Sequence, residues 1–440
     1  MMRILLKGGH VVDPAAGVNG AADVLIGDDG RIARVGRDLP ADGGAVYEVP
    51  RGWIVAPGLI DMHVHLREPG QEQKETIATG TAAAIAGGFT AVACMPNTDP
   101  VNDQASVTEL ILRKAAQAGL ARVYPIGAVS RDSRGEQLAD IAELHRAGCV
   151  AVTDDGRPVA TALLMRRALE YAGMFDIPVI DHCEDQSLKG DGVAHEGYHA
   201  SVLGLRGIPA AAEAIMVERD VTLGELTGAA VHIAHMSVRG SLRAVRSGKE
   251  RGVGVTCEVT PHHFTLSDEA LAGYDTNVKM NPPLRDAADR DAIIEGLADG
   301  SIDAIATDHA PHHYDEKLVE FDRAPFGIVG LETAVALTFD RLVHTGRIGL
   351  PRMIELLSVN PARILRVPGG TLREGSPADI TVLAPEMRVK VSAAEFRSKS
   401  RNTPFDGWEL RGGVGATIVG GRVLYAHRDV ASKWGAHVPA

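Results

Sequence analysis

Eight short apolar segments recur along the middle of this chain, and each ends at or just before a residue that can bind a metal ion or hold an anion. The first ends in His63-Val64-His65 and the last in Asp308-His309. Their length and content predict strands at 54–65, 89–95, 122–129, 150–154, 178–182, 231–235, 254–259 and 303–308. Helical patterns lie between them, for example at 75–86 and 161–172. Eight strands alternating with helices predict an α/β protein with a (β/α)8 TIM-like barrel.

The two ends of the chain lack this alternation and are similar in texture to each other. Residues 1–52 and 369–440 contain short strand-like runs, and Asp29-Gly30 is a hairpin turn signal. We expect the two ends to pair as one small β-sandwich domain beside a barrel at 53–368. In such barrels the catalytic residues follow the strands, which is where this chain carries its candidate ligands.

The composition of the chain excludes some classes of function. The net charge of −12 argues against a nucleic-acid-binding protein, which would need a basic surface. The four cysteines lie far apart without a Cys-x-x-Cys pair, so we expect no disulfides and a cytoplasmic protein. The apolar run at the N-terminus is too short for a signal peptide, and no run approaches the ~18 residues of a membrane span. We therefore expect a soluble enzyme with neither a membrane nor a nucleic acid as its partner.

His63 and His65 lie two residues apart, so their imidazoles project from the same face of an extended segment. With 17 histidines in 440 residues, about 0.7 such pairs arise by chance, so two structural histidines are the alternative. Three further strand ends carry His182, His235 and Asp308. Histidines together with carboxylates suit Zn²⁺, and this set indicates a site for a pair of ions.

A pair of ions needs a bridging anion. Thr153-Asp154-Asp155-Gly156 follows the fourth predicted strand, and either aspartate could supply the bridge. Asp-Asp-Gly is also an ordinary turn signal, so the pattern alone leaves a simple turn open.

Longer motifs carry a family resemblance. Residues 61–70 (DMHVHLREPG) and 306–312 (ATDHAPH) resemble the two signatures of dihydroorotase, in the amidohydrolase superfamily. Shorter segments match in the same order, at 95–98, 182–185, 235–237, 279–285 and 325–327. The similarity runs from about Gly8 to Leu424 and is greatest to the long, class I bacterial enzymes.

The resemblance implies two zinc ions per chain. It assigns them to six residues, which are His63, His65, Asp155, His182, His235 and Asp308. The first two histidines and Asp308 would hold one ion, and the other two histidines the second. Asp155 would bridge the ions in place of the carboxylated lysine of related hydantoinases, because this strand end has no lysine. Asp308 would also be the catalytic acid and base.

The resemblance also implies a substrate and its contacts. The reaction would be the reversible interconversion of L-dihydroorotate and N-carbamoyl-L-aspartate in de novo pyrimidine (UMP) biosynthesis. The substrate would contact His65, Arg67, Asn97, Asn281, His312 and the backbone at Phe326 and Gly327.

Two other interpretations remain open. A hydantoinase, dihydropyrimidinase or allantoinase is one, and Arg67 and the missing bridge lysine argue against it. A non-catalytic scaffold bound to aspartate carbamoyltransferase is the other, and the intact ligand set argues against that as a sole role. Such a partner, or a homo-oligomer, is still compatible with an active enzyme.

Other residues have less specific predictions. His195 and His199 are expected in a loop, and Cys183 is expected to pack as a small apolar side chain. His262 and His263 follow the seventh strand, so they would line the pocket or support a ligand. Surface or second-domain positions are expected for His10, His145, His344, His427 and His437. Residues 313–324 are predicted to form a mobile lid that orders when substrate binds.

Overall fold

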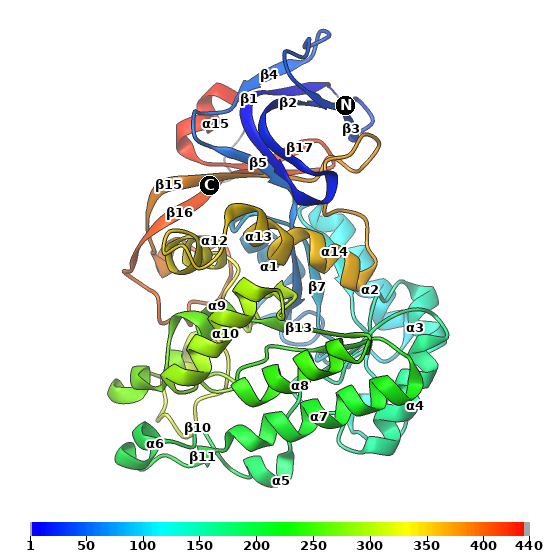
Figure 1. Ribbon diagram of the computed structural model, residues 1–440, viewed down its shortest axis with the longest axis vertical. Helices are drawn as coiled ribbons and strands as arrows, with labels where there is room; N and C mark the ends of the chain where they lie inside the picture. Colours follow the sequence, from blue (N-terminus) through cyan, green and yellow to red (C-terminus); the bar gives the residue numbers. More distant parts are fainter. Residues whose placement is uncertain (1, 435–440) are drawn as a thin grey trace.

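The computed structural model describes residues 2–434, so the prediction for His437 lies outside the described residues. Figure 1 shows a sheet domain at one end of the molecule and a larger unit of strands and helices at the other. The first and last described segments of the chain, from residue 2 and up to residue 434, lie in or beside the sheet domain. No helix among residues 2–434 combines the length and the apolar content that crossing a membrane requires.

Seven strands of the larger unit are parallel and occupy the predicted positions. They are β6 (Leu59–Val64), β7 (Phe89–Cys94), β8 (Arg122–Pro125), β9 (Val179–Asp181), β12 (Val231–Ile233), β13 (Val255–Val259) and β14 (Ala304–Ile305). They pair in the orders β6-β7-β8 and β9-β12-β13-β14. Single parallel bridges connect these two groups into a ring, from Gly127 to Val152, from Val152 to Val179 and from Val64 to His309.

Two strand predictions need correction. The fourth strand, predicted at 150–154, is reduced to bridges at Val152. The first, predicted as one strand at 54–65, is divided at Gly58 into β5 (Ile54–Pro57) and β6. A Cβ on Gly58 would lie 2.2 Å from Thr90 Oγ1, so a glycine is needed where the chain leaves one sheet and enters the other.

The predicted domain built from both chain ends is confirmed as one mixed sheet of eight strands. Its members are β1 (Ile4–Asp13), β2 (Val18–Ile26), β3 (Ile32–Gly36), β4 (Ala45–Glu48), β5, β15 (Ile380–Lys390), β16 (Glu409–Val419) and β17 (Arg422–Ala426). The two ends meet where β5 pairs with β15. The strand β1 pairs first with β4 and further along with β5, and the sheet encloses its own core of aliphatic side chains. The division at residues 52 and 368 stays a prediction, although β5 extends the sheet to Pro57.

Helices follow most barrel strands and cover them (Figure 1). The longer ones are α1 (Ile77–Ala86), α2 (Ala105–Ala118), α4 (Ala162–Gly173), α7 (Ala210–Thr227), α8 (Arg239–Glu250) and α10 (Ala287–Asp299). The shorter ones are α3 (Ile141–Ala147), α5 (Gln186–Lys189), α6 (Tyr198–Leu203), α9 (Pro261–Thr265), α11 (Tyr314–Lys317), α12 (Ala334–Thr338), α13 (Leu350–Ile354), α14 (Asn360–Leu365) and α15 (Arg428–Trp434). A two-stranded sheet of β10 (Ala194–His195) and β11 (Gly207–Ile208) lies among α5, α6 and α7.

Inside the ring a compact apolar cluster supports the residues that follow the strands. Met62, Ala93, Ile180 and Ala306 belong to this cluster, and Leu365 of α14 packs with them. His182 and Asp308 each come two residues after a member of the cluster, so close packing fixes the chain that carries them.

Candidate metal centre

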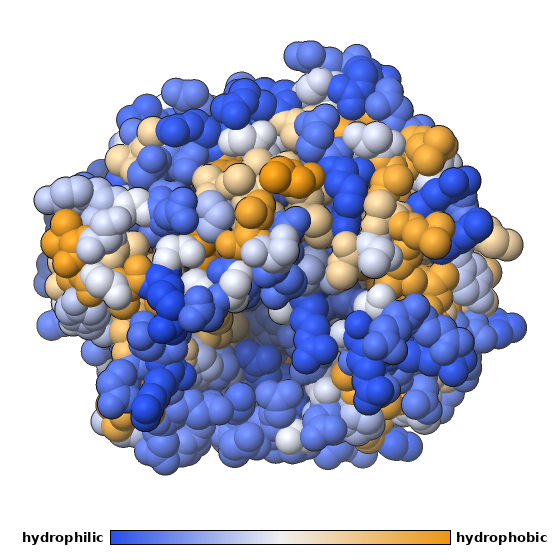
Figure 2. Space-filling model, turned by 90° about the horizontal axis from the view of Figure 1, so that it is seen from below, coloured by the Kyte–Doolittle hydropathy of each residue, from blue (hydrophilic) through white to orange (hydrophobic). Residues whose placement is uncertain are grey.

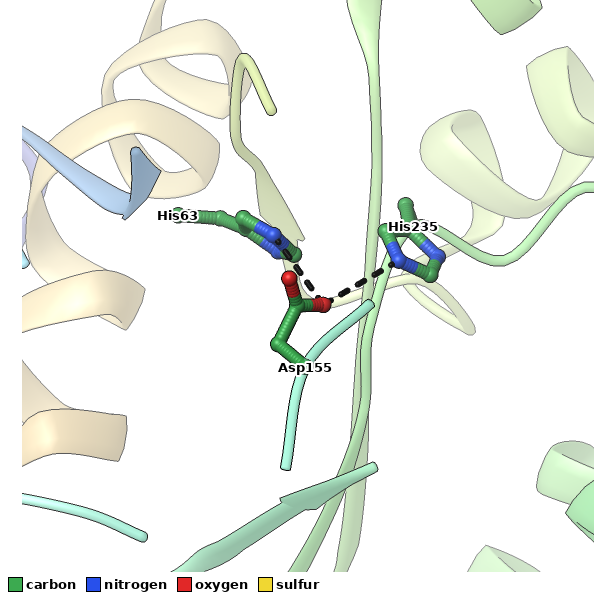
Figure 3. A group of neighbouring side chains, drawn as sticks. All are labelled: His63, Asp155 and His235. Carbon is green, nitrogen blue, oxygen red and sulfur yellow. Dashed lines mark ion pairs between the residues drawn. The ribbon is translucent and has the colours of Figure 1, made fainter. Parts of the chain in front are cut away.

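All six predicted ligand side chains are buried and meet at the strand ends. Figure 3 shows His63 and His235 on either side of Asp155, whose Oδ1 lies 3.4 Å from His63 Nε2 and 3.6 Å from His235 Nε2. Asp308 Oδ1 lies 3.0 Å from His65 Nε2 and 3.4 Å from His63 Nε2. The sixth residue, His182, places Nδ1 4.0 Å from Asp155 Oδ1 and 2.9 Å from His235 Nε2.

Two overlapping groups have the spacing that a metal ion requires. In one group the ligand atoms of His63, His65 and Asp308 all lie within 4.8 Å of one another, and in the other those of His63, Asp155 and His235 do. His63 belongs to both groups. The geometry therefore resembles two adjacent metal sites that share His63 as a ligand.

Unpaired polar atoms show that these residues fit a metal cofactor. His63 Nε2 and Asp155 Oδ1 face each other in the centre, are buried and have no hydrogen-bond partner among the described residues. Leaving such an atom unpaired costs on the order of 1–3 kcal/mol. Imidazole nitrogens and carboxylate oxygens are metal ligands, so a bound cation would satisfy atoms that the protein alone leaves unsatisfied.

The electrostatics of the centre favour positive charge. Burial opposes protonation of His63, but Asp155 and Asp308 together raise its pKa well above the ordinary value. Burial likewise opposes ionisation of Asp308, yet His63 and His65 hold its pKa below the usual range. The carboxylates therefore remain ionised and attract cations to the centre.

The backbone is strained at three of the predicted site residues. Arg67, His235 and Asp308 have φ angles of 60°, 31° and 47°, in the left-handed region that side-chain-bearing residues rarely adopt. Such strain costs on the order of 1–3 kcal/mol per residue and is typical of functional sites.

A polar pocket of about 140 Å³ adjoins the centre. Figure 2 shows the face that lies away from the sheet domain, which is hollowed at its middle and hydrophilic around the hollow. Five residues predicted to contact substrate line the pocket, namely His65, Arg67, Asn281, Phe326 and Gly327. Five of the six predicted ligands also line it, namely His65, Asp155, His182, His235 and Asp308, whereas His63 is not among the lining residues.

Asn97 and His312 support the pocket from behind. Asn97 Oδ1 accepts from His65 Nδ1 at 2.9 Å, and its amide nitrogen donates to the Asp155 carbonyl at 3.4 Å. His312 Nε2 donates to the Phe326 carbonyl at 2.8 Å. The hydrogen bonds of both side chains named above join them to residues that line the pocket.

Sequence reasoning missed three charged residues of the site. Lys189 lines the pocket, and its ammonium pairs with Glu184 at 2.6 Å. Glu184 in turn lies 3.3 Å from His182 Nε2. Glu258 lies 2.7 Å from His63 Nδ1. The signal for Glu258 was a carboxylate within the apolar strand β13, because such a residue needs a buried partner.

The segment predicted as a lid is held by two buried lysines. Lys279 Nζ donates to the Phe321 carbonyl at 2.7 Å, and Lys317 Nζ donates to the Pro325 carbonyl at 2.7 Å. Residues 314–317 form α11. These contacts place the segment beside Phe326 of the pocket, and its mobility stays a prediction.

The other predictions have mixed outcomes. His195 lies in β10 and His199 in α6, so the expected loop is partly regular structure. His262 and His263 are both buried in α9. Cys183 is buried, as expected, and its thiol donates to the Asp220 carboxylate.

A parallel barrel with histidines and aspartates at its strand ends, beside a pocket lined by charged residues, is typical of metal-dependent hydrolases of the amidohydrolase class. Residues 52–241 match a family model described as dihydro-orotase-like. The dihydroorotase of Pelotomaculum thermopropionicum is 56% identical over 98% of this chain and 100% of its own length. That of Syntrophotalea carbinolica is 54% identical over 97% of this chain and 100% of its own length. The chain belongs to the dihydroorotase family.

Solved structures show the same fold in hydantoinases. The L-hydantoinase (dihydropyrimidinase) from Arthrobacter aurescens has a TM-score of 0.88, with 23% identity over 100% of this chain and 98% of that chain. The D-hydantoinase from Thermus sp. has a TM-score of 0.79, with 27% identity over 96% of this chain and 94% of that chain. The predicted fold class is therefore confirmed.

Proposed function

We propose that this protein is a zinc-dependent dihydroorotase, which interconverts L-dihydroorotate and N-carbamoyl-L-aspartate in pyrimidine biosynthesis. The observation that carries the proposal is the position of Arg67 in the same pocket as the histidine and aspartate cluster. A guanidinium can bind a carboxylate with two hydrogen bonds, and dihydroorotate carries a ring carboxylate that simple hydantoins and dihydrouracil lack. The family of the chain supports the same activity.

The proposed cofactor is a pair of zinc ions. His63, His65 and Asp308 would hold one ion, His182 and His235 the other, and Asp155 would contact both. The two overlapping groups support the part of this assignment that concerns His63, His65, Asp155, His235 and Asp308. His182 belongs to neither group, and its place in the proposal is supported by its distances of 4.0 Å from Asp155 and 2.9 Å from His235. When bound, the ions would lower the pKa of a water molecule and polarise the ring amide carbonyl.

Asp308 is the proposed catalytic acid and base. Its carboxylate lines the pocket and is ionised, so it can accept a proton from the attacking water. The same oxygen then delivers that proton to the departing ring nitrogen. In the reverse direction Asp308 takes a proton from the carbamoyl nitrogen as the ring closes.

The remaining proposed contacts orient the ring. Asn281 and the backbone at Phe326 and Gly327 line the pocket, so they can hold the ring amide and its carbonyl. Asn97 and His312 contact residues that line the pocket, and we propose that they also contact the substrate beside Arg67. Holding the ring over Asp308 converts proton transfer into an intramolecular step.

A hydantoinase is the second candidate, because solved hydantoinases share the fold. Asp155, however, lies 3.4 Å from His63, 3.6 Å from His65 and 3.6 Å from His235, and Arg67 adds a cation suited to a substrate carboxylate. Steady-state kinetics with dihydroorotate, dihydrouracil and hydantoin separate the two. The proposal requires that dihydroorotate has the highest kcat/KM, and it is overturned if dihydrouracil or hydantoin does.

Location and assembly are further parts of the proposal. All four cysteines are free and buried, which supports a reducing compartment such as the cytoplasm. Exposed apolar side chains on α6 and α7, among them Val202 and Ile215, support a homo-oligomer or a protein partner such as aspartate carbamoyltransferase. Sedimentation of the protein alone and mixed with the carbamoyltransferase tests both.

A further inference from the structure

A buried carboxylate that the proposed chemistry does not use lies directly behind the metal centre. Glu258, in β13, is 1% exposed, and its Oε1 is 2.7 Å from His63 Nδ1. Its Oε2 is 3.4 Å from Nε2 of His232, which lies on the neighbouring strand β12. Both neighbours of this carboxylate are imidazoles, but only His63 makes a hydrogen bond to it, because Glu258 Oε2 and His232 Nε2 have no hydrogen-bond partner among the described residues.

The contact determines which nitrogen of His63 faces the centre. His63 is the residue common to both candidate metal groups, and its Nε2 points at Asp155 and Asp308. Hydrogen bonding of Nδ1 to a carboxylate places the ring proton on Nδ1 and leaves the Nε2 lone pair free. That is the tautomer that can bind a metal through Nε2.

The other ligands have weaker or shared supports. The support of His65 is the neutral amide oxygen of Asn97. His182 lies 3.3 Å from Glu184, but that carboxylate also pairs with the Lys189 ammonium at 2.6 Å. The ion-pair contacts of Glu258 are with two imidazoles and with no lysine or arginine. His63, the histidine that both groups share, is therefore supported by a carboxylate whose charge no basic side chain neutralises.

A third contact orients the imidazole beside Glu258. His232 Nδ1 lies 2.8 Å from Thr256 Oγ1, and this turns the His232 ring so that Nε2 faces the carboxylate. His232 and Thr256 are also paired neighbours on β12 and β13. The carboxylate therefore lies between the His232 ring and His63, and His63 is its hydrogen-bond partner.

We infer that Glu258 is a positioning residue, which fixes the tautomer and orientation of His63 and thereby sets the affinity of the centre for the metal that His63 holds. The inference rests on the proposed metal centre. Supports of this kind typically change metal affinity by about 10- to 100-fold when they are removed.

The test compares metal binding by Glu258→Gln and Glu258→Leu with binding by the parent. The glutamine keeps an oxygen that can accept from His63 Nδ1 but removes the charge, whereas the leucine removes both. Each metal-stripped protein is titrated with Zn²⁺ against a chromophoric chelator. We expect affinity to fall about 10-fold for the glutamine and about 100-fold for the leucine.

Asp13→Asn is the matched control. Asp13 is fully buried in the sheet domain and accepts from Ala16 N, Thr371 Oγ1 and Leu372 N, so the change also removes a buried carboxylate. We expect it to lower the thermal midpoint of the metal-free protein while zinc affinity stays at the parent value. Glu258→Gln should show the opposite pattern, with a small change in midpoint and a large loss of affinity.

The outcomes separate this inference from the proposed function. Zinc binding by Glu258→Gln within two- to three-fold of the parent overturns the positioning role, and so does an equal loss in Asp13→Asn. If the leucine variant does not fold, the glutamine variant decides. Failure of the parent itself to bind zinc would contradict the metal centre, which is a different result.

Discussion

Replacing Arg67 with methionine tests the substrate assignment most sharply. The side chain is 9% exposed, lines the pocket, and is held by a bond from its Nε to the Pro311 carbonyl at 3.2 Å. Burial lowers the pKa of Arg67 to about 10, so the guanidinium is still charged at neutral pH. Methionine has a similar length, and it tolerates the left-handed backbone at this position no better and no worse than arginine.

The expected loss of dihydroorotate turnover follows from the proposed charge pair between Arg67 and the ring carboxylate of the substrate. Removing one partner of a buried, hydrogen-bonded charge pair costs about 2–5 kcal/mol, which is roughly 30- to several-thousand-fold in kcat/KM. The lost bond to Pro311 adds about 1 kcal/mol to folding only, and the zinc content should not change. For Arg67→Lys we expect a kcat/KM for dihydroorotate between that of the parent and that of Arg67→Met, because a lysine keeps the charge but cannot form two parallel hydrogen bonds.

The assay is steady-state kinetics on the zinc-loaded variants, with dihydroorotate and dihydrouracil compared. Dihydrouracil has no ring carboxylate, so any slow hydrolysis of it should be nearly unaffected by Arg67→Met. Dihydroorotate kinetics within three-fold of the parent would refute the reasoning. An equal loss for both substrates would also refute it, since that result indicates damage to the metal centre.

Asp308→Asn should keep the fold and lower turnover in both directions by at least ~100-fold, because an amide cannot accept the proton; activity within a few-fold of the parent removes Asp308 as the acid and base. Residues 313–324 should gain hydrogen-exchange protection when substrate binds, and equal protection with and without it indicates a static segment. Burial raises the pKa of Glu332 from 4.5 to about 7. The folded protein therefore binds this proton more tightly than the unfolded chain does, and the stability that this difference gives is lost as the pH rises from about 4.5 through 7. Glu332→Gln should therefore gain stability relative to the parent between about pH 5 and pH 8, by up to ~3 kcal/mol; a constant difference in denaturant titrations contradicts this.

The strand pattern predicted the barrel well because ligand-type residues mark the strand ends. The weakest prediction was the first strand, since the apolar run 54–64 is continuous and nothing in its hydrophobicity marks the break at Gly58. The break becomes visible only when Thr90 of the next strand lies against it. The fourth strand was overestimated for a related reason, because apolar content at 150–154 does not specify how much of the segment forms paired backbone.

The ligands were predictable from sequence, whereas their supports were not. His63 and His65 form a motif, but Glu258 contacts His63 across 195 positions of sequence separation. Lys189 is one lysine in a polar stretch, and only folding brings it to the pocket with Glu184. Pairings of this kind depend on the curvature of the barrel and the packing of α5, which local patterns do not encode.

The most direct test of the central claim is a zinc titration of the metal-stripped protein, with dihydroorotate turnover measured at each step. The account predicts negligible turnover without metal, a rise with added zinc, and a plateau at about two equivalents per chain. A plateau at one equivalent would contradict only the claim that two ions bind, and not the proposed activity. Full dihydroorotate turnover by the metal-free protein, or no turnover with both equivalents bound, would contradict the proposed function.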